Sequence, residues 1–551
     1  HIHTYRITPL SLWNAAASGL AAPGVIESLE AHSKYELPGN VRADIADYVS
    51  RYGRVKLVRE DSHLLLVSDD RALLAEIANH RKLTPYLIGR HITGGLIVDP
   101  AQRGHLKHAL VLIGYPAEDL AGYVSGTALD IQLRGETALA GLPFSLRPYQ
   151  QEAADIFHAS GTARGGSGVI VLPCGAGKTL VGLGIMAQLR CQTLILCPSI
   201  VAAHQWMREI ADRTSVSPDL IGEYTGERKQ IRPITITTYQ TLTYRPNRAN
   251  EFPHFALFNE LDWGLIVYDE VHLLPAPVFR VTAEIQARRR LGLTATLVRE
   301  DGRETDVFSL IGPKKYDVPW KDLERQGWIA TAECHEVRLT MADERRMEYA
   351  IADEREKYRI AAENPTKLLI LDQLVAKHAD DQVLIIGQYI DQLTAVAERF
   401  SAPLITGKTP TLEREKLYAA FRDGTIRLLV VSKVANFAID LPDANVAIQI
   451  SGTFGSRQEE AQRLGRILRP KRNGLVAHFY SLITRDTRDQ EFAANRQMFL
   501  TEQGYRYEIL YENEIAVFRP VTLQLAANPD RADNPPSQMS SGPRLIQSGD
   551  G

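Results

Sequence analysis

Residues 169–179 read Val-Ile-Val-Leu-Pro-Cys-Gly-Ala-Gly-Lys-Thr, and a helical pattern follows from Leu180 to Leu189. An apolar run that passes through a glycine-rich turn into a helix is typical of a buried strand in an α/β protein. A strand before the turn and a helix after it are also the context that a phosphate-binding loop requires. The stretch therefore predicts the class of fold and one binding site together.

The chemistry of the loop comes from five consecutive residues. Gly175, Ala176 and Gly177 allow backbone N–H groups to converge on phosphate oxygens at the N-terminus of a helix. Lys178 would neutralise the β- and γ-phosphates of ATP, and Thr179 would bind Mg²⁺. The general pattern has a glycine five residues before its second glycine, whereas this chain has Leu172 there. The loop alone could be a chance turn.

A second chemical signal lies downstream, where residues 265–272 read Leu-Ile-Val-Tyr-Asp-Glu-Val-His. A buried strand here ends in two carboxylates. Asp269 would hold Mg²⁺ through water, and Glu270 would orient or deprotonate the attacking water. An Asp-Glu pair after a strand is usually only the start of a loop. ATP hydrolysis needs both halves, so the phosphate loop upstream favours the catalytic interpretation.

A third signal is the stretch 462–470, which reads Gln-Arg-Leu-Gly-Arg-Ile-Leu-Arg-Pro. Arg466 and Arg469 are three residues apart and share one face of a helix. Two guanidinium groups on that face could reach a transferring phosphoryl group and stabilise its developing charge. Taken alone, the stretch would be interpreted as a basic surface helix.

Strand and helix patterns divide the chain into four zones: 1–142, 143–325, 326–510 and a tail from 511. The second and third zones both alternate strands with helices, which predicts two parallel sheets in tandem. Between the two predicted sheets, the dense charges of residues 343–357 predict one helix with a solvated surface. The predicted strands are 169–172, 193–197, 235–238, 265–268 and 290–293 in the second zone, and 383–386, 428–431, 446–450 and 476–480 in the third.

The order of these motifs resembles that of superfamily 2 helicases, and more narrowly that of the XPB-like helicases. The phosphate loop, the acidic pair, Thr294-Ala295-Thr296 and the 462–469 stretch occur in the family's order. An Arg-Glu-Asp triplet at 299–301 follows the threonine motif, as it does in XPB-like proteins. The resemblance covers about 145 to 490 and implies two RecA-like domains, preceded by a mixed α+β front region.

The resemblance also assigns residues beyond those that the motifs alone explain. Arg147 and Gln150 resemble the adenine-reading motif, and Gln462 joins them at the nucleotide. His272, Asp440 and the motif Thr294, Ala295 and Thr296 would couple the ATP site to DNA. The implied DNA contacts are Ser199, Thr237, Thr238, Arg299, Glu300, Asp301 and Ser432. The four hydroxyl residues among these contacts could equally be strand ends and helix caps.

Two departures from the family pattern affect the expected mechanism. Motif V commonly reads Glu-Gly-Ile-Asp, but here residues 437–440 read Phe-Ala-Ile-Asp, so the acid and the glycine are missing. The family's helical thumb has room only at about 341–366. A short thumb slightly favours movement along duplex DNA without strand separation.

The front zone and the tail carry no catalytic motif. Strand-like 64–67 leads into a helical stretch at 71–80, and a second helical pattern covers 104–114. The zone resembles the N-terminal region of bacterial XPB-like proteins, so about 62–135 could engage damaged DNA or act as a docking module. The tail is rich in Pro, Asn, Ser and Gly from about 518, which predicts disorder.

Composition sets broader limits. The 551 residues include 44% hydrophobic and 23% charged side chains, enough apolar material for several cores. The net charge of -3 gives no electrostatic indication of nucleic acid, but amides, hydroxyls and a few arginines can hold a phosphate backbone.

The four cysteines lack zinc-site spacing and are expected to be reduced thiols. The sequence shows neither a membrane-spanning run nor a signal peptide, which predicts a cytoplasmic protein, associated with the nucleoid if bacterial. Because residue 1 is His, further residues are expected upstream.

We therefore expect an ATP- and Mg²⁺-dependent 3′-to-5′ DNA helicase, acting in nucleotide excision repair. Polarity and pathway follow from the resemblance alone. One alternative is a duplex-DNA translocase that remodels complexes without separating strands, another is a non-catalytic DNA-binding scaffold, and a third is an RNA helicase. The tail shows no nuclease constellation, so any DNA cleavage would need a nuclease or repair-protein partner.

Overall fold

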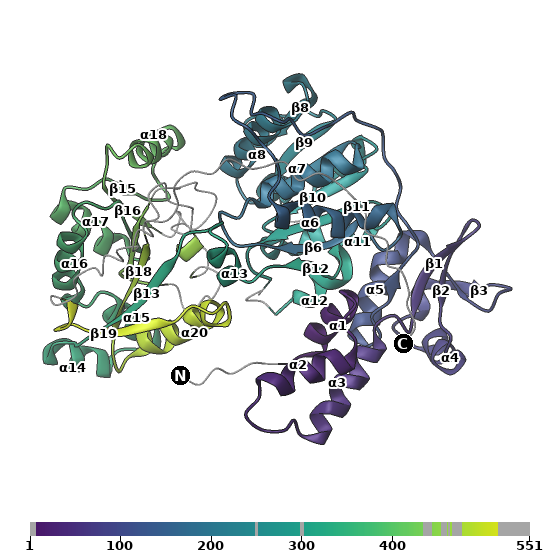
Figure 1. Cartoon of the computed structure of the whole chain (residues 1–551), viewed down its shortest axis with the longest axis horizontal. Coiled ribbons are helices and arrows are strands. Elements are labelled where there is room, and N and C mark those ends of the chain that lie inside the picture. Colours follow the sequence, from purple (N-terminus) through teal and green to yellow (C-terminus); the bar gives the residue numbers. More distant parts are fainter. Residues whose placement is uncertain are drawn as a thin grey trace, which may run out of the picture.

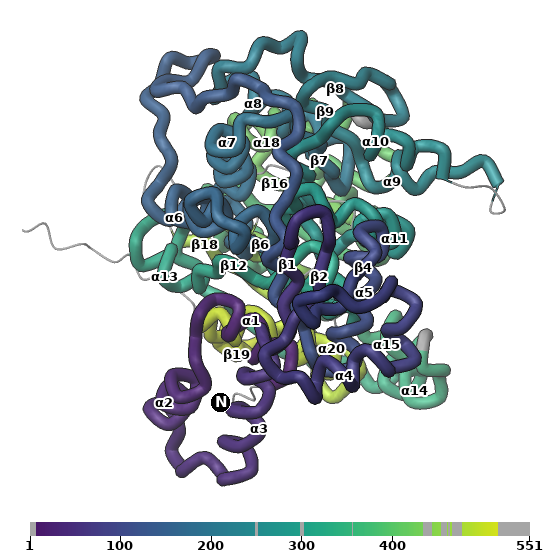
Figure 2. The backbone as a smooth tube through the Cα atoms, turned by 90° about the vertical axis from the view of Figure 1, so that its right-hand side faces the viewer, coloured from purple at the N-terminus to yellow at the C-terminus, as the bar shows by residue number. Residues whose placement is uncertain are grey.

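The computed structural model of the chain describes residues 7–247, 252–297, 302–432, 444–452, 460, 463–465 and 476–515. Two α/β domains stand side by side, and the front part of the chain lies against the first of them (Figure 1). A view from the side shows helices α1 (Pro9–Ala17), α2 (Ala22–His32) and α3 (Gly39–Arg51) at the base of the molecule (Figure 2). Residues 516–551, where the sequence predicts a disordered tail, lie outside the described residues.

The first α/β domain is built on a seven-stranded parallel sheet in the order β12-β6-β11-β10-β7-β9-β8. Successive apolar residues of β6, β7 and β10 pack alternately into two apolar clusters, one on each face, because helices cover both faces. The strands are β6 (Ser167–Val171), β7 (Thr193–Cys197), β8 (Ile221–Tyr224), β9 (Ile234–Thr238), β10 (Leu265–Asp269), β11 (Arg289–Thr294) and β12 (Lys314–Asp317). The helices are α6 (Pro148–His158), α7 (Lys178–Leu189), α8 (Ile200–Arg213), α9 (Tyr239–Leu242), α10 (Leu257–Glu260), α11 (Ala276–Glu284), α12 (Glu304–Asp306) and α13 (Trp320–Arg325).

The second domain repeats this architecture, with a parallel sheet in the order β15-β16-β14-β17-β18-β13-β19. Both domains are therefore RecA-like, as expected. The strands are β13 (Ala332–Leu339), β14 (Val383–Gly387), β15 (Leu404–Ile405), β16 (Leu428–Ser432), β17 (Val446–Gln449), β18 (Ala477–Thr484) and β19 (Tyr507–Tyr511). The helices outside the thumb region are α16 (Thr366–Lys377), α17 (Ile390–Phe400), α18 (Thr411–Arg422) and α20 (Arg488–Glu502).

The prediction of one charged helix at 343–357 is wrong, because two helices stand there. Helix α14 (Asp343–Ile351) ends where Ala352 takes an extended conformation, and α15 (Glu354–Ala362) begins after it. The Asp353 carboxylate accepts a hydrogen bond from the Glu356 N–H and so starts the second helix. Helix α14 has no buried residue, as a solvated helix should, whereas α15 buries Tyr358 and packs against α20. These two helices fill the space available for a thumb.

The front part contains the three basal helices and a mixed sheet in the order β3-β4-β2-β1-β5. Helix α5 lies between β4 and β5 in the chain and packs against α11 of the first domain. The two backbones meet so closely that a Cβ at Gly104 would lie 2.4 Å from the Ala283 carbonyl oxygen, so this crossing requires a glycine. The remaining elements are β1 (Lys56–Glu60), β2 (His63–Val67), α4 (Arg71–Asn79), β3 (Leu87–Arg90), β4 (Leu96–Val98), α5 (Arg103–Leu112) and β5 (Glu118–Asp119).

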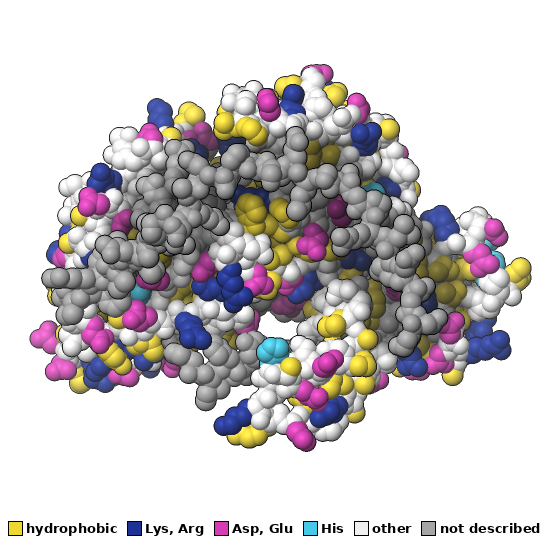
Figure 3. Space-filling view, viewed as in Figure 1, with side chains coloured by type: hydrophobic (Ala, Val, Ile, Leu, Met, Phe, Trp, Pro, Cys, Tyr) yellow, Lys and Arg dark blue, Asp and Glu magenta, His cyan; other side chains and the backbone are white. Residues whose placement is uncertain are grey.

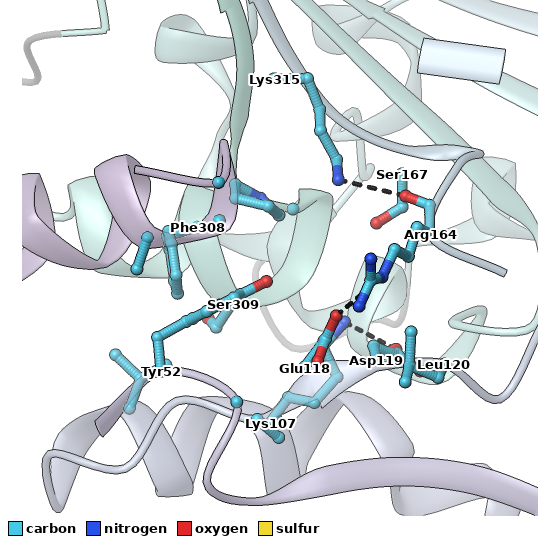
Figure 4. Close-up of a pocket in the computed structure, with 18 of the residues that line it drawn as sticks. Tyr52, Lys107, Glu118, Asp119, Leu120, Arg164, Ser167, Phe308, Ser309 and Lys315 are labelled. Carbon is cyan, nitrogen blue, oxygen red and sulfur yellow. Dashed lines mark hydrogen bonds and ion pairs between the residues drawn. The ribbon is translucent and has the colours of Figure 1, made fainter. Parts of the chain in front are cut away.

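A buried ion cluster joins the front part to the first domain beside a cavity of about 290 Å³ (Figure 4). Asp119 accepts hydrogen bonds from Arg103 at 2.6 and 3.1 Å, and its Oδ2 lies 3.0 Å from Lys107 Nζ. Lys107 also donates to the Gln286 side chain of the first domain, at 3.0 Å. Within the front part, Asp119 thus offsets the lost hydration of both buried cations, and Lys107 carries the contact to the first domain. At the cavity, Arg164 pairs with Glu118 at 3.2 Å.

The chain between the front sheet and α6 runs along the first domain. The N–H groups of Val124, Leu129 and Arg134 donate to carbonyl oxygens of that domain at 2.9 Å each. Figure 2 shows this segment rising beside β6 and α7 before it turns into α6. The front part is therefore tied to the first domain by its helix α5 and by this segment.

The described surface carries mixed charges. Figure 3 shows acidic and basic side chains interspersed over the described part of one face, consistent with a net charge close to zero. Of the helices in the described part of the chain, none is both long and apolar enough to cross a bilayer.

Candidate nucleotide and nucleic-acid site

The phosphate loop lies between β6 and α7, as predicted. Gly175 and Gly177 both have φ of +81°, a left-handed conformation that costs glycine nothing. A Cβ at Gly177 would also lie 2.4 Å from the Gln150 amide nitrogen. Both the backbone conformation and the lack of space therefore require a glycine at this position. Helix α7 begins at Lys178, and its first N–H groups have the orientation that binds phosphate. The loop therefore fits a nucleotide phosphate.

Gln150 supports the loop from behind. It is 1% exposed and donates from its amide to the Ala176 carbonyl oxygen at 2.8 Å, while its own carbonyl accepts from the Arg147 N–H. The Tyr149 hydroxyl donates to the same Ala176 oxygen at 2.7 Å. The Arg147 guanidinium lies over the Trp328 ring, 4.8 Å from its centroid, in the segment that leads to the second domain. The structure thus shows Gln150 holding the loop; adenine recognition stays a prediction.

The acidic pair meets the loop from β10. Lys178 Nζ lies 3.3 Å from Glu270 Oε1, and Glu270 has φ of +49°, a conformation uncommon for a residue with a side chain. Such strain at a charged residue is typical of functional sites. Asp269 Oδ2 accepts a hydrogen bond from the Trp206 indole at 3.0 Å. The Tyr239 hydroxyl donates to the Asp269 carbonyl oxygen at 2.8 Å. Two aromatic residues therefore fix the strand end.

Burial and neighbouring charges shift the pKa values of Asp269 and Lys178. Burial and the neighbouring charge of Glu270 raise the pKa of Asp269 to about 6. Burial alone would lower the pKa of Lys178, but the carboxylates of Glu270 and Asp269 outweigh it and leave that pKa raised. Lys178 is therefore a firmly charged ammonium, suited to phosphate. Asp269, with Thr179 at the start of α7, could hold Mg²⁺ once it is ionised.

We expect the Trp206→Phe substitution to raise the midpoint pH of Mg²⁺-dependent nucleotide binding. Protonated Asp269 cannot serve the metal, so Mg²⁺-dependent binding should fall as the pH drops through about 6. Loss of the indole donor removes a hydrogen bond that lowers this pKa, and the midpoint should rise by roughly one unit. Binding of a non-hydrolysable ATP analogue, titrated with and without Mg²⁺ between acid and neutral pH, measures the midpoint.

Trp13→Phe is the matched control, because Trp13 donates its indole N–H to the Tyr48 carbonyl oxygen in the front part. Its midpoint should equal that of the unsubstituted protein. A Trp206→Phe midpoint at or below that of the unsubstituted protein would contradict this assignment.

The raised pKa of Asp269 also affects folding, since a carboxyl whose pKa rises on folding favours the folded state at low pH. That contribution is lost as pH rises from about 4 to about 6.

The expected coupling residues form a continuous path away from Glu270. His272 Nδ1 lies 3.4 Å from Glu270 Oε2 and 2.6 Å from the Thr294 hydroxyl oxygen. Thr294 then donates to the Thr296 carbonyl oxygen at 2.6 Å, and Ala295 between them is buried. The Glu270 carboxylate is therefore linked to the end of β11. The Arg299-Glu300-Asp301 triplet, which comes next in the chain, lies outside the described residues, as does Asp440.

The four expected hydroxyl contacts fall into two groups. Ser199 caps α8 by accepting from the Ala202 N–H at 3.2 Å, and Thr238 caps α9 by accepting from the Thr241 N–H at 3.1 Å. Thr237 and Ser432 are buried at the ends of β9 and β16, and their hydroxyl oxygens have no hydrogen-bond partner among the described residues. Capping therefore explains the first pair, whereas nothing in the described structure satisfies the second pair.

The second domain approaches the phosphate loop through residues 463–465. A Cβ at Gly465 would lie 2.3 Å from Cys174 Cβ, so this glycine touches the residue that precedes Gly175. Leu464 is buried in the same apolar cluster as Ala176 of the loop. Gln462, Arg466 and Arg469 lie outside the described residues, but the described part of their segment is beside the loop.

Several residues of the site are not among those predicted from the sequence. Trp206, Tyr239 and Tyr149 hold the acidic strand end or the loop, and Cys174 and Gly465 form the contact between the domains. Tyr239 directly follows Thr238 and Tyr149 directly precedes Gln150, and these positions were the only signal that could have indicated the two tyrosines. The contact between Cys174 and Gly465 joins residues far apart in the sequence and leaves no local pattern.

Comparisons with known proteins agree with this geometry. Residues 323–528 match the model described as ERCC3/RAD25/XPB C-terminal helicase, residues 143–299 match the type III restriction enzyme res subunit, and residues 1–91 match a helicase conserved C-terminal domain. An ATP-dependent type ISP restriction-modification enzyme solved on DNA shares the fold at 14% identity, with a TM-score of 0.52 over 67% of this chain and 31% of that chain.

Two relatives extend over nearly the whole chain. The DNA 3′-5′ helicase XPB of Mycobacterium tuberculosis is 57% identical over 92% of this chain and 90% of its own length. The TFIIH helicase/translocase subunit XPB of Encephalitozoon cuniculi is 35% identical over 94% of this chain and 79% of its own length. Identity at this level includes the front part as well as both RecA-like domains. The chain therefore belongs to the XPB family of helicases.

Proposed function

We propose that this protein is an ATP-dependent DNA helicase or translocase that moves 3′ to 5′ and acts in nucleotide excision repair. The observation that carries the proposal is the meeting of Lys178, at the start of α7, with Glu270, directly after β10, at a distance of 3.3 Å. Phosphate binding and water activation both need this pair. The Mycobacterium tuberculosis relative, named a DNA 3′-5′ helicase, supports the polarity, and the Encephalitozoon cuniculi relative, named a subunit of a transcription and DNA repair factor, supports a role in repair.

The chain's own residues divide the work of hydrolysis. Lys178 would leave Glu270 to neutralise the phosphates of ATP, and Asp269 with Thr179 would hold the Mg²⁺ that offsets the remaining charge. Glu270 would then orient or deprotonate the attacking water. Arg466 and Arg469 of the second domain would complete the site when the domains close. The contact of Gly465 with Cys174 supports this, because it brings the arginine segment to the loop.

Movement would come from opening and closing of the two domains. Nucleotide binding favours the closed form, and hydrolysis with product release favours the open form. The contacts from Glu270 through His272 to Thr294 support this, because they would transmit a change at the Glu270 carboxylate toward the DNA side. DNA would be held mainly by phosphate contacts, so binding should be weakly sequence-specific and salt-sensitive. Thr237 and Ser432 are candidates for these contacts, because their buried hydroxyls lack a described partner.

The front part would engage distorted DNA or dock a partner protein. A nuclease or another repair protein would supply any cutting, and association with the nucleoid would follow from DNA binding. The close packing of α5 on α11 supports a rigid connection, so a partner bound to the front part could act on the first RecA-like domain.

Three alternative functions would give different results in the same assays. A duplex translocase would displace a triplex-forming strand but leave a tailed duplex intact, and the two short helices α14 and α15 favour this rival over a helicase with a long thumb. A scaffold would bind DNA without ATP turnover. An RNA helicase would be stimulated by RNA. The test is therefore ATP hydrolysis with each nucleic acid, followed by strand displacement and triplex displacement on 3′- and 5′-tailed substrates.

A further inference from the structure

A cluster of histidines and carboxylates lies on the second RecA-like domain, apart from the nucleotide site. Glu333 and His335 are on β13, His478 is on β18 and Glu508 is on β19. The strand register pairs Glu333 with His478 and His335 with Glu508. Paired residues of a parallel sheet, and residues two apart on one strand, share a face. All four side chains therefore project from one face of the sheet, near the amino ends of their strands.

Three donor atoms of this cluster converge. His478 Nδ1 lies 3.4 Å from Glu333 Oε2, and His335 Nε2 lies 3.9 Å from the same oxygen. All three atoms lie within 4.8 Å of one another. Two ligands held at 2.0 to 2.1 Å on a tetrahedral zinc ion are separated by about 3.4 Å. The spacing of the donors is thus close to what a zinc ion would impose.

A second carboxylate orients the buried imidazole. Glu508 Oε2 lies 3.1 Å from His335 Nδ1, on the opposite side of the ring from the converging donors. Metal-bound histidines usually donate their other ring N–H to a carboxylate in this way, which fixes the tautomer and aims the second nitrogen at the metal. A metal ion binds the neutral form of an imidazole, and Nε2 of His335 is the ring nitrogen that faces Glu333.

The surroundings leave the cluster open on one side. His335 is buried, its side chain 2% exposed, whereas the Glu333 and Glu508 side chains are each 52% exposed. His378, at the end of α16, lies beside His478 but uses its own nitrogens on Asp381 and the Tyr480 hydroxyl. It therefore stands outside the donor set. Water could complete a fourth position from the exposed side.

We propose that Glu333, His335 and His478 form a binding site for a zinc-type divalent transition-metal ion, oriented by Glu508. Two imidazole nitrogens and one carboxylate oxygen suit zinc and disfavour Mg²⁺, which prefers oxygen ligands. The ion would tie the start of β13 to β18. Since β13 is the first strand after the segment that leaves the first domain, the ion would brace the second domain where that segment enters it (Figure 1).

The test is zinc binding to the full chain, without nucleotide and with excess Mg²⁺ to occupy the acidic pair. Equilibrium dialysis and metal analysis should give one zinc ion per chain. Saturating zinc should raise the melting temperature by roughly 5 °C. Co²⁺ should give the intense visible absorption of a four-coordinate site. Glu333→Gln should abolish the bound zinc and the shift, and because Glu333 is half-exposed this variant should fold normally.

His478→Gln should behave as Glu333→Gln does, and Glu508→Gln should weaken binding about 10- to 100-fold, as loss of an orienting carboxylate does. His91→Gln, which removes an imidazole from the front part, is the control and should bind zinc as the unsubstituted chain does. Undiminished zinc binding by Glu333→Gln and His478→Gln would overturn the proposal. Failure of the unsubstituted chain to bind zinc under these conditions would overturn it equally. Neither result depends on helicase activity.

Discussion

Glu270→Gln is expected to lower kcat for ATP hydrolysis about 10³-fold, equivalent to about 4 kcal/mol of transition-state stabilisation. Glutamine keeps the size and the hydrogen-bonding shape of the side chain but cannot accept the proton of the attacking water. ATP affinity should be equal or higher, because Lys178 loses the carboxylate 3.3 Å away that competes with phosphate. Single-turnover hydrolysis and equilibrium binding of labelled ATP measure the two effects separately.

Glu260→Gln is the control for this prediction. Glu260 ends α10 in the same domain, is exposed, and loses the same charge on substitution. Its kcat should match that of the unsubstituted protein. The assignment of Glu270 would be wrong if Glu270→Gln kept more than about a tenth of the normal rate, since catalysis by a positioned base is worth at least 10²-fold.

Asp119→Asn should destabilise the junction between the front part and the first RecA-like domain by about 3 to 5 kcal/mol. The substitution leaves the Arg103 guanidinium charged and buried, and it removes the carboxylate that opposes the effect of burial on Lys107, whose pKa burial lowers to about 8; the two side chains are 2% and 7% exposed. Burial alone would raise the pKa of Asp119, but the charges of Lys107 and Arg103 outweigh it and hold that pKa well below its usual value. The stabilisation is therefore present above about pH 4 and is lost as the pH falls further.

Urea unfolding of the full chain, followed by proteolysis of the front part, measures this loss. Because the chain has several domains that can unfold separately, the midpoint to compare is that of the urea transition in which the front part becomes open to the protease. Asp47→Asn is the control, because Asp47 pairs with Arg51 on the surface of α3, and such pairs contribute at most about 1 kcal/mol. Equal midpoints for Asp119→Asn and Asp47→Asn would show that the buried cluster does not hold the interface.

The core of both sheets could be predicted because a buried parallel strand is an uninterrupted apolar run. All nine predicted strands are present, with ends displaced by a few residues at most. The strands that were missed lack this pattern. β12 reads Lys-Lys-Tyr-Asp at the sheet edge, β15 has only two residues, and β13 alternates polar and apolar side chains. Such strands are defined by the neighbours with which they pair, and no local pattern reports that pairing.

The candidate site divides in the same way. Lys178, Asp269 and Glu270 could be predicted because their chemistry depends on short motifs with fixed spacing. The residues that tune them could not. Trp206 reaches Asp269 across 63 positions of sequence, and the Asp119 cluster joins segments that no motif connects. Glu333, His335 and His478 meet only through the pairing of β13 with β18, so the cysteine and histidine spacing gave no sign of them.

The central claim is that DNA drives ATP hydrolysis at the site between the two domains. The most direct measurement is the hydrolysis rate of the unsubstituted protein and of Glu270→Gln with no nucleic acid, single-stranded DNA, duplex DNA and RNA. The account predicts strong stimulation by DNA, little by RNA, and loss of turnover in the variant. Turnover that is indifferent to every nucleic acid, or that survives in Glu270→Gln, would contradict it.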